Sequence, residues 1–318
     1  MAQRNYPCDS IIDAYFDTSG TYFTDVGELP FKRGLYHCML GQAIEMKSNI
    51  ETRKSTNQIG HILWQLNEIW PTGGWGSLEY GTPNFPGQVI GGRWKPLHYM
   101  LGREIFTDIS ATCGTLSCYV RNDLPGLSFN GTLKIISINI GNGVTSTIMK
   151  KNLNIVSGPS QLSWFDLPTN FQGVSSSVVF QLVVTDQNQH VVATNTLLRD
   201  VPKHLKGLPS DSGLTVMVVD DNDNDNDNDV SGESGDATTT IKVSSNVPVS
   251  LYVTLTTLAQ GRFEDNAFAL VCDSSHFNTT TSTQGECSRT LKFFHFVDVD
   301  QIKLLKSSLR VEDLATYQ

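Results

Sequence analysis

Two glutamates in the stretch WQLNEIWPTGGWGSLEYG, residues 64–81, have the side-chain type that acid–base and nucleophilic chemistry requires. Two carboxyl groups about 5–5.5 Å apart can cleave a glycosidic bond with retention, one as acid and base and the other as nucleophile. In barrel enzymes such groups come from the ends of different strands. Because Glu68 and Glu79 lie eleven positions apart on one loop, we expect no catalytic pair here. Glu68 is expected to order the loop or to pair with an arginine.

The same stretch holds three of the five tryptophans of the chain, Trp64, Trp70 and Trp75. Flat aromatic side chains can stack on the C–H face of a sugar ring, while a nearby amide such as Asn67 binds its hydroxyl groups. The alternative is a small aromatic core beneath the loop, which involves no ligand. The residue types leave both interpretations open.

The elements that would position this stretch follow a helix, strand, loop, helix order. Apolar residues in 31–56 recur close to a period of 3.6, which predicts a helix. The apolar run 60–66 predicts a buried strand of the parallel-sheet type. Residues 93–106 predict a second helix, with Pro96 near its start, where proline is tolerated. This order is typical of an α/β unit and places Trp64 at the end of a strand.

From about residue 108 the sequence becomes rich in short β-type segments separated by turns. Their spacing and frequent alternation indicate antiparallel sandwiches. A polar, proline-containing break at 198–213 divides them, so we predict two sandwich domains, 107–206 and 207–318. The expected strands lie in 116–123, 131–141, 177–187, 213–221, 239–246, 249–258 and 289–300.

The run DDNDNDNDND at 220–229 carries a dense set of like charges. Such a run buries nothing apolar and repels itself, which predicts a disordered insertion over 220–236. Alternating Asp and Asn could also supply oxygen ligands to calcium. The glycine and final acid of an EF-hand loop are out of register here, so we favour the insertion.

Composition and cysteine usage limit the possible functions. The net charge of −9 argues against nucleic-acid binding, and no apolar run is long enough to predict a membrane-spanning helix. The first residues lack the apolar core of a signal peptide, and no Cys or His spacing suggests a metal site. We therefore expect no metal site. Two cysteine pairs could each form a disulfide or remain as free thiols: Cys113 with Cys118, and Cys272 with Cys287.

Asn130 and Asn278 begin tripeptides that permit N-glycosylation in a secretory route, although such tripeptides also occur by chance.

Four segments together resemble a known family. The stretches GHILWQLNEIWPTGGWGSLEYG (60–81) and GGRWKPLHYML (91–101) look like the end of the catalytic barrel in β-mannosidases of glycoside hydrolase family 2. The helix-type segment 35–54 resembles the helix before the last barrel strand of those enzymes. Independently, VSLYVTLTTLAQGRFEDNAFAL (249–270) is similar to their C-terminal immunoglobulin-like domain, which carries a Gly-Arg-Phe-x-Asp-Asn-x-Phe signature.

This resemblance implies α/β plus all-β architecture: the C-terminal end of a (β/α)8 barrel over 1–106, followed by two immunoglobulin-like sandwiches. It implies a retaining exo-β-mannosidase that releases terminal β-mannose from oligosaccharides or glycoproteins, without a cofactor. Because the family places its catalytic glutamates on earlier barrel strands, both should precede Met1, so this chain alone should be inactive. The expected substrate-binding residues are Trp64, Asn67, Trp70 and Trp75, with Trp64 as the floor beneath the terminal sugar. A full-length protein of this kind is expected in the lysosome or the secretory pathway.

Two other functions stay open at this point. The chain could be a non-catalytic carbohydrate-binding sandwich protein, with the tryptophan-rich stretch as its binding surface. It could also serve another family-2 exo-glycosidase, because sugar choice depends largely on pocket residues outside this chain. In each case the expected partner is a glycan, without nucleic acid or membrane.

Overall fold

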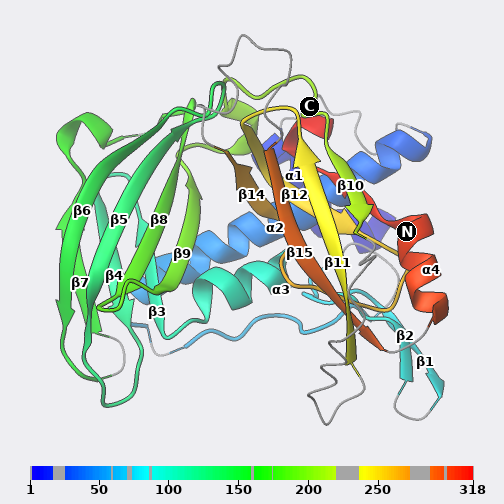
Figure 1. Ribbon diagram of the computed structural model, residues 1–318, viewed down its shortest axis with the longest axis horizontal. Coiled ribbons are helices and arrows are strands. Elements are labelled where there is room, and N and C mark those ends of the chain that lie inside the picture. Colours follow the sequence, from blue (N-terminus) through cyan, green and yellow to red (C-terminus); the bar gives the residue numbers. More distant parts are fainter. Residues whose placement is uncertain are drawn as a thin grey trace. The chain divides into compact units, whose positions relative to one another are not determined.

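The computed structural model describes residues 2–16, 26–58, 60–69, 74–85, 88–158, 161–173, 175–219, 236–272, 287–296 and 299–317. They form two compact units (Figure 1). The first combines Met1–Trp64 with Leu97–Leu208, and the second combines Gln65–Pro96 with Pro209–Gln318. Each unit thus contains part of 1–106 together with one of the two β-rich regions. The domain boundaries expected from the sequence remain predictions.

The helices of the first unit include both helices expected from the sequence. Helix α2, Glu28–Ser55, covers the expected 31–56, and it is joined to α1, Ala2–Phe16, by a disulfide between Cys8 and Cys38. The expected helix at 93–106 begins later, as α3, Pro96–Met100, and continues as the π-helical turn η1, Leu101–Ile105. Pro96 stands at the first helical position, where its missing N–H leaves no hydrogen bond unmade.

The predicted strand over 60–66 is wrong for this structure. Residues 60–64 have irregular backbone, and the side chains of Ile62 and Trp64 are 101% and 74% exposed. A parallel strand is stable when neighbouring strands cover both of its edges. No strand in the described part of the chain pairs with 60–66, so the apolar run stays open to solvent. A barrel over residues 1–106 therefore remains a prediction.

The β-rich part of the first unit is made of two antiparallel sheets. Strands β3 (Ile109–Cys113), β4 (Ser117–Asn122) and β7 (Gln161–Asp166) form one sheet, in the order β3-β4-β7. The other has the order β6-β5-β8-β9, and its strands span Thr145–Ile155, Phe129–Asn139, Val178–Asp186 and Val191–Leu198. Buried side chains from both sheets, such as Val120, Leu133 and Phe180, form one core. Alternation along β8 directs Phe180, Leu182 and Val184 into it.

The second unit also contains two antiparallel sheets. One has the order β10-β11-β15-β13, with strands Thr215–Val218, Asp236–Ser245, Cys287–Phe296 and Gly261–Phe263. The other has the order β14-β12-β16, with strands Phe268–Val271, Val249–Thr256 and Arg310–Glu312. Helix α4, Val299–Ser308, the 3-10 turn η5, Leu314–Tyr317, and a hairpin of β1, Gly81–Phe85, with β2, Gln88–Gly91, complete it. The described chain is therefore mostly β-sheet with few helices.

Buried charges fix α2 on the outer side of β4. The Tyr119 hydroxyl donates to the backbone oxygen of Glu51 at 2.7 Å, and Arg121 Nη1 donates to the backbone oxygen of Lys54 at 2.7 Å. On the same helix, Lys47 pairs with Glu51 at 2.9 Å and with Glu104 of η1 at 3.5 Å. Burial alone would lower the pKa of Lys47, but the two carboxylates outweigh it and raise that pKa. Helix and sheet are thus joined by specific polar contacts.

Both cysteine pairs singled out in the sequence are bonded in the structure. Cys113 and Cys118 face each other in the β3–β4 register, and Cys272 joins Cys287 at the start of β15. Asn130 lies near the start of β5 and is half-buried. Asn278 and residues 220–235 of the predicted insertion lie outside the described residues, whereas its last residue, Asp236, begins β11.

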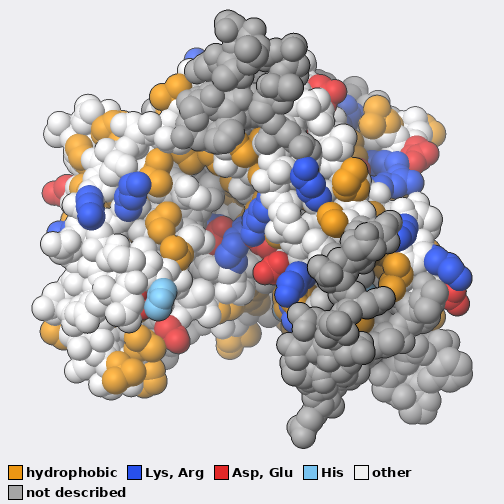
Figure 2. All heavy atoms as spheres, in the orientation of Figure 1, with side chains coloured by type: hydrophobic (Ala, Val, Ile, Leu, Met, Phe, Trp, Pro, Cys, Tyr) orange, Lys and Arg blue, Asp and Glu red, His pale blue; other side chains and the backbone are white. Residues whose placement is uncertain are grey.

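On the face seen in Figure 2, hydrophobic side chains over the strands of the first unit, at left, lie in small separate groups. This distribution fits a sandwich whose large apolar residues lie between its sheets. Among the described residues, no helix is long and apolar enough to cross a membrane. The same residues contain no cluster of three or more His, Cys, Asp or Glu side chains with metal-site geometry.

Candidate functional site

Residues 65–96, here called the tryptophan loop, are organised by three short extended pieces at 66–68, 77–79 and 93–95. Leu78 bridges Asn67 on one side and Trp94 on the other. Backbone hydrogen bonds of 3.0 Å, 2.9 Å and 3.0 Å join Glu68 to Leu78, Glu79 to Arg93, and Lys95 to Ser77. The loop is therefore a small hydrogen-bonded ladder, with piece 77–79 at its centre.

Two glycines allow the pieces to approach so closely. A Cβ on Gly76 would lie 2.5 Å from both Asn67 C and Glu68 N, which are backbone atoms. A Cβ on Gly74 would lie 2.5 Å from a carboxylate oxygen of Glu68. Glycine is thus required at positions 74 and 76 by the packing of the loop on itself.

Glu68 forms the buried centre of the loop. Its Oε1 accepts hydrogen bonds from Lys95 Nζ at 2.6 Å and from Gly74 N at 3.0 Å, and Lys95 Nζ also donates to Gly74 O at 3.1 Å. Burial lowers the pKa of Lys95, while the hydrogen bond and charge of Glu68 act against that shift. The expectation that Glu68 orders the loop fits this geometry, although its partner is a lysine instead of an arginine.

Glu79 is also engaged by a cation of the loop. The guanidinium of Arg93 forms an ion pair with it, and Arg93 Nη1 donates to the backbone oxygen of Thr257. The sequence assigned Arg93, Trp94 and Lys95 to the final helix, which is wrong because all three precede α3. Pro96 indicates the later start of the helix, because the residue before a proline is biased toward extended backbone.

Three of the four predicted binding residues lie in the described part of the chain, and these three are exposed. Trp75 is 41% exposed, and Asn67 is exposed with its Nδ2 donating to Glu68 O at 3.2 Å. Trp64 belongs to the first unit, and Trp70 lies outside the described residues. Asn67 and Trp75 therefore lie on one loop, and the side chains of both reach solvent.

This arrangement suits binding better than bond cleavage. Glu68 is buried in a salt bridge and Glu79 is paired with Arg93, so neither carboxylate of the loop is available as a nucleophile. An exposed indole and an exposed amide are the groups that hold a pyranose by stacking and hydrogen bonding. The described loop can thus contribute a wall of a sugar site.

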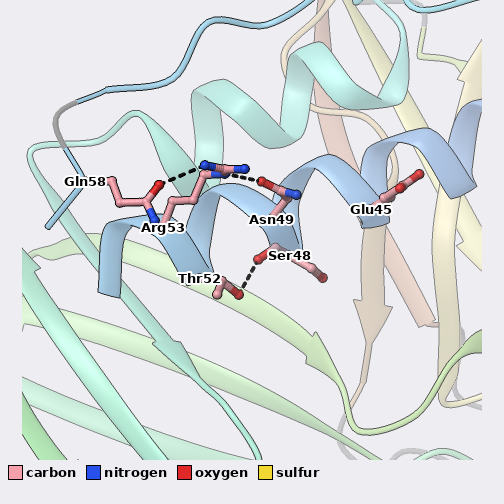
Figure 3. Close-up of a pocket in the computed structure, with 6 residues that line it drawn as sticks. All are labelled: Glu45, Ser48, Asn49, Thr52, Arg53 and Gln58. Atoms are coloured by element: carbon pink, nitrogen blue, oxygen red, sulfur yellow. Dashed lines mark hydrogen bonds between the residues drawn. The ribbon is translucent and has the colours of Figure 1, made fainter. Parts of the chain in front are cut away.

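A hollow lies on the exposed side of α2, with a cavity volume of about 440 Å3 (Figure 3). Its polar side chains satisfy one another locally: Arg53 donates to Asn49 Oδ1 at 2.7 Å and to Gln58 Oε1 at 2.8 Å, and the Thr52 hydroxyl donates to Ser48 O at 2.8 Å. Among the described residues that line it, Glu45 is the single carboxylate, so these residues offer no acid–base pair.

Comparison with known proteins places these features in a wider context. No protein-family model matches the sequence. β-Mannosidase A of Aspergillus niger is 26% identical over 238 residues, covering 67% of this chain. β-Mannosidase of Capra hircus is 39% identical over 82 residues, covering 23% of this chain and 8% of that protein. The chain spans 22% of the length of the Aspergillus niger relative, so it matches a part of a longer protein.

Solved structures share the fold at low sequence identity. An exo-chitosanase of Amycolatopsis orientalis, CsxA, aligns with a TM-score of 0.58 and 15% identity, covering 89% of this chain and 34% of that one. A β-D-mannosidase of Dictyoglomus thermophilum aligns with a TM-score of 0.58 and 17% identity, covering 91% and 30%. Both similarities concern the fold. In both alignments, this chain covers about a third of the solved protein.

Proposed function

We propose a role in sugar hydrolysis, starting from the finding that the chain resembles the C-terminal portion of the β-mannosidases of glycoside hydrolase family 2. In this proposal the tryptophan loop forms one wall of the site that receives a terminal β-mannose. The observation that carries the proposal is the prebuilt loop, which exposes Trp75 and Asn67 while Lys95 and Arg93 neutralise its two glutamates.

The chemistry in this proposal is double displacement through a covalent glycosyl-enzyme, without a cofactor. Two carboxyl groups would carry it, and both would come from residues outside this chain. Trp64, which is 74% exposed, would stack beneath the terminal sugar. Trp70 stays a candidate wall residue.

The first test separates binding from hydrolysis. The chain as given should leave a chromogenic β-mannoside uncleaved, and clear turnover would contradict the proposal. It should still bind a β-mannoside, detected by saturation-transfer NMR. Trp75→Ala and Asn67→Ala should each weaken that signal. Trp164→Ala should not, because Trp164 is a similarly exposed tryptophan on β7 in the other unit.

A secretory or lysosomal location also belongs to the proposal. Three disulfides support it, because such bonds persist in oxidising compartments. Secretion from cultured eukaryotic cells should give a chain whose mobility increases after N-glycosidase treatment. Asn130→Gln should remove part of that shift, and an unchanged shift would exclude Asn130 as an acceptor.

A non-catalytic carbohydrate-binding protein is the alternative from another functional class. Both functions predict sugar binding by this chain, so the gene decides between them. An open frame before Met1 that encodes an Asn-Glu strand and a second Glu-bearing strand supports the hydrolase, and a promoter there supports the binding protein. Titration with a β-glucosaminide beside the β-mannoside tests the third possibility, a different family-2 sugar specificity.

A further inference from the structure

The outer edge of the tryptophan loop is attached to the C-terminal sandwich by directional contacts. Gly91 N donates to Gln260 Oε1 at 3.0 Å, and Arg93 donates to the backbone oxygen of Thr257. The backbone N of Gln260 is held in turn by Gln301 Oε1 at 2.7 Å. Both acceptors lie just before β13, within the segment 249–270 on which the sequence resemblance rests.

Arg262 of β13 adds a third contact. Its guanidinium lies over the Trp94 ring, 5.3 Å from the centroid, and over the Phe294 ring, 4.3 Å from the centroid. Arg262 and Phe294 are register partners between β13 and β15, so the strand pairing sets the position of the charge. A Cβ on Gly261 would lie 2.3 Å from Phe294 O, so glycine permits this close pairing.

These contacts reach the exposed binding residues through the ladder of the loop. The piece 93–95 is bonded to 77–79, and 77–79 is bonded to 66–68, which carries Asn67. Gly76 packs directly on the backbone of Asn67 and precedes the central piece, while Trp75 is its neighbour in sequence. A displacement of residues 91–94 would therefore move both Asn67 and Trp75.

We propose that Arg262 and Gln260 are positioning residues for the sugar site: they fix the tryptophan loop so that Trp75 and Asn67 face a β-linked pyranose together. This inference rests on the proposed function for its ligand. The C-terminal sandwich then takes part in the geometry of the site without touching the sugar.

The test uses the full chain labelled with 5-fluorotryptophan, its resonances assigned by single Trp→Phe variants. Arg262→Ala and Gln260→Ala should each shift the Trp75 resonance and weaken β-mannoside binding by about two- to fivefold, as loss of one cation–π contact or hydrogen bond implies. Arg262→Lys should restore part of the affinity, because a cation over Trp94 is retained. Arg310→Ala, at the exposed first position of β16 in the same sandwich, serves as the matched control.

The binding measurement and the Trp75 resonance test different claims. If the unaltered chain binds no β-mannoside, the proposed function is contradicted, and the Trp75 resonance still decides whether the sandwich positions the loop. An unchanged Trp75 resonance and affinity in both Arg262→Ala and Gln260→Ala, with far-UV circular dichroism preserved, would overturn the positioning role. If Arg262→Ala does not fold, Gln260→Ala alone tests the positioning role, since this variant removes only the hydrogen bond from Gly91 N.

Discussion

The ion pair of Glu68 with Lys95 lies deeper than any other charge in the described tryptophan loop, with side-chain exposures of 2% and 5%. Removing one partner of such a pair leaves the other charge buried and uncompensated. Lys95→Met should therefore lower the free energy of unfolding of the chain by about 3–5 kcal/mol in urea denaturation. The double variant Glu68→Gln/Lys95→Met should recover most of the loss, and a double variant as unstable as Lys95→Met would contradict this account.

The pH dependence of Glu68→Gln follows from the same pair. Burial already lowers the pKa of Lys95, so its charged form is disfavoured in the folded state once Glu68 is gone. A basic group with a lowered folded pKa destabilises the protein at low pH, and the loss fades as pH rises above that folded pKa. The cost of Glu68→Gln should thus be smaller at pH 10 than at pH 7.

Gly76 allows a steric prediction for the same loop. Because its Cβ would lie 2.5 Å from two backbone atoms of Asn67 and Glu68, neither of which can rotate away, Gly76→Ala should separate the pieces 66–68 and 77–79. We expect a loss of about 1–3 kcal/mol in stability and faster amide exchange at Glu68 and Leu78. Gly60→Ala is the control, since a Cβ there meets nothing within 4 Å.

At the scale of elements, the pairing of α1 with α2 should depend on pH. His37 of α2 is 4% exposed and stacks on Phe16 of α1, with ring centroids 4.1 Å apart. Burial, assisted by the charge of Arg33, lowers the pKa of His37 from 6.5 to about 3. Between pH 6.5 and about pH 3, His37 binds a proton in the unfolded chain but not in the folded chain. The contribution of neutral His37 to stability is therefore fully present above pH 6.5 and is lost as pH falls through this window.

The expected slope is about 1.4 kcal/mol for each pH unit inside that window. It can be measured by urea denaturation between pH 7 and pH 4. His37→Gln should flatten the profile because it removes the titrating ring. His190→Gln, on an exposed histidine of the first sandwich, should leave it unchanged. A profile that stays steep in His37→Gln would assign the acid sensitivity to other groups.

The elements that the sequence predicted well are those with their own periodicity. Helix α2 and the strands β5, β8 and β12 follow patterns of period 3.6 or 2 that local residues alone create. The strand over 60–66 failed because its stability depends on neighbouring strands. The partners of Glu68 and Cys8 were missed since both contacts join residues 27 to 30 positions apart. A single sequence carries no local signal for such contacts.

At the scale of the whole molecule, each of the two β-rich regions forms a compact unit with a different part of residues 1–106. The first sandwich packs with α2 and η1, and the second packs with the tryptophan loop. In both cases directional polar contacts make the attachment, through Arg121 and Tyr119 in the first unit and through Gln260 and Arg262 in the second. Helix α2 and η1 should therefore unfold together with the sheets of the first unit. The tryptophan loop should likewise unfold together with the sheets of the second unit.

Arg121 tests this cooperativity in the first unit. Its Nη1 donates to Lys54 O and to Asn57 Oδ1, both at 2.7 Å, and its Nε donates to Asp123 Oδ1 at 2.8 Å. Arg121→Ala leaves buried acceptors at the end of α2 without this donor, which should cost about 2–4 kcal/mol. In native-state hydrogen exchange, peptides of α2 should then lose protection before those of β8, whereas both open together in the unaltered chain. Lys134→Ala, at an exposed position of β5, should keep them together. Equal loss in α2 and β8 after Arg121→Ala would mean that the apolar contacts of the helix suffice to hold it on the sheet.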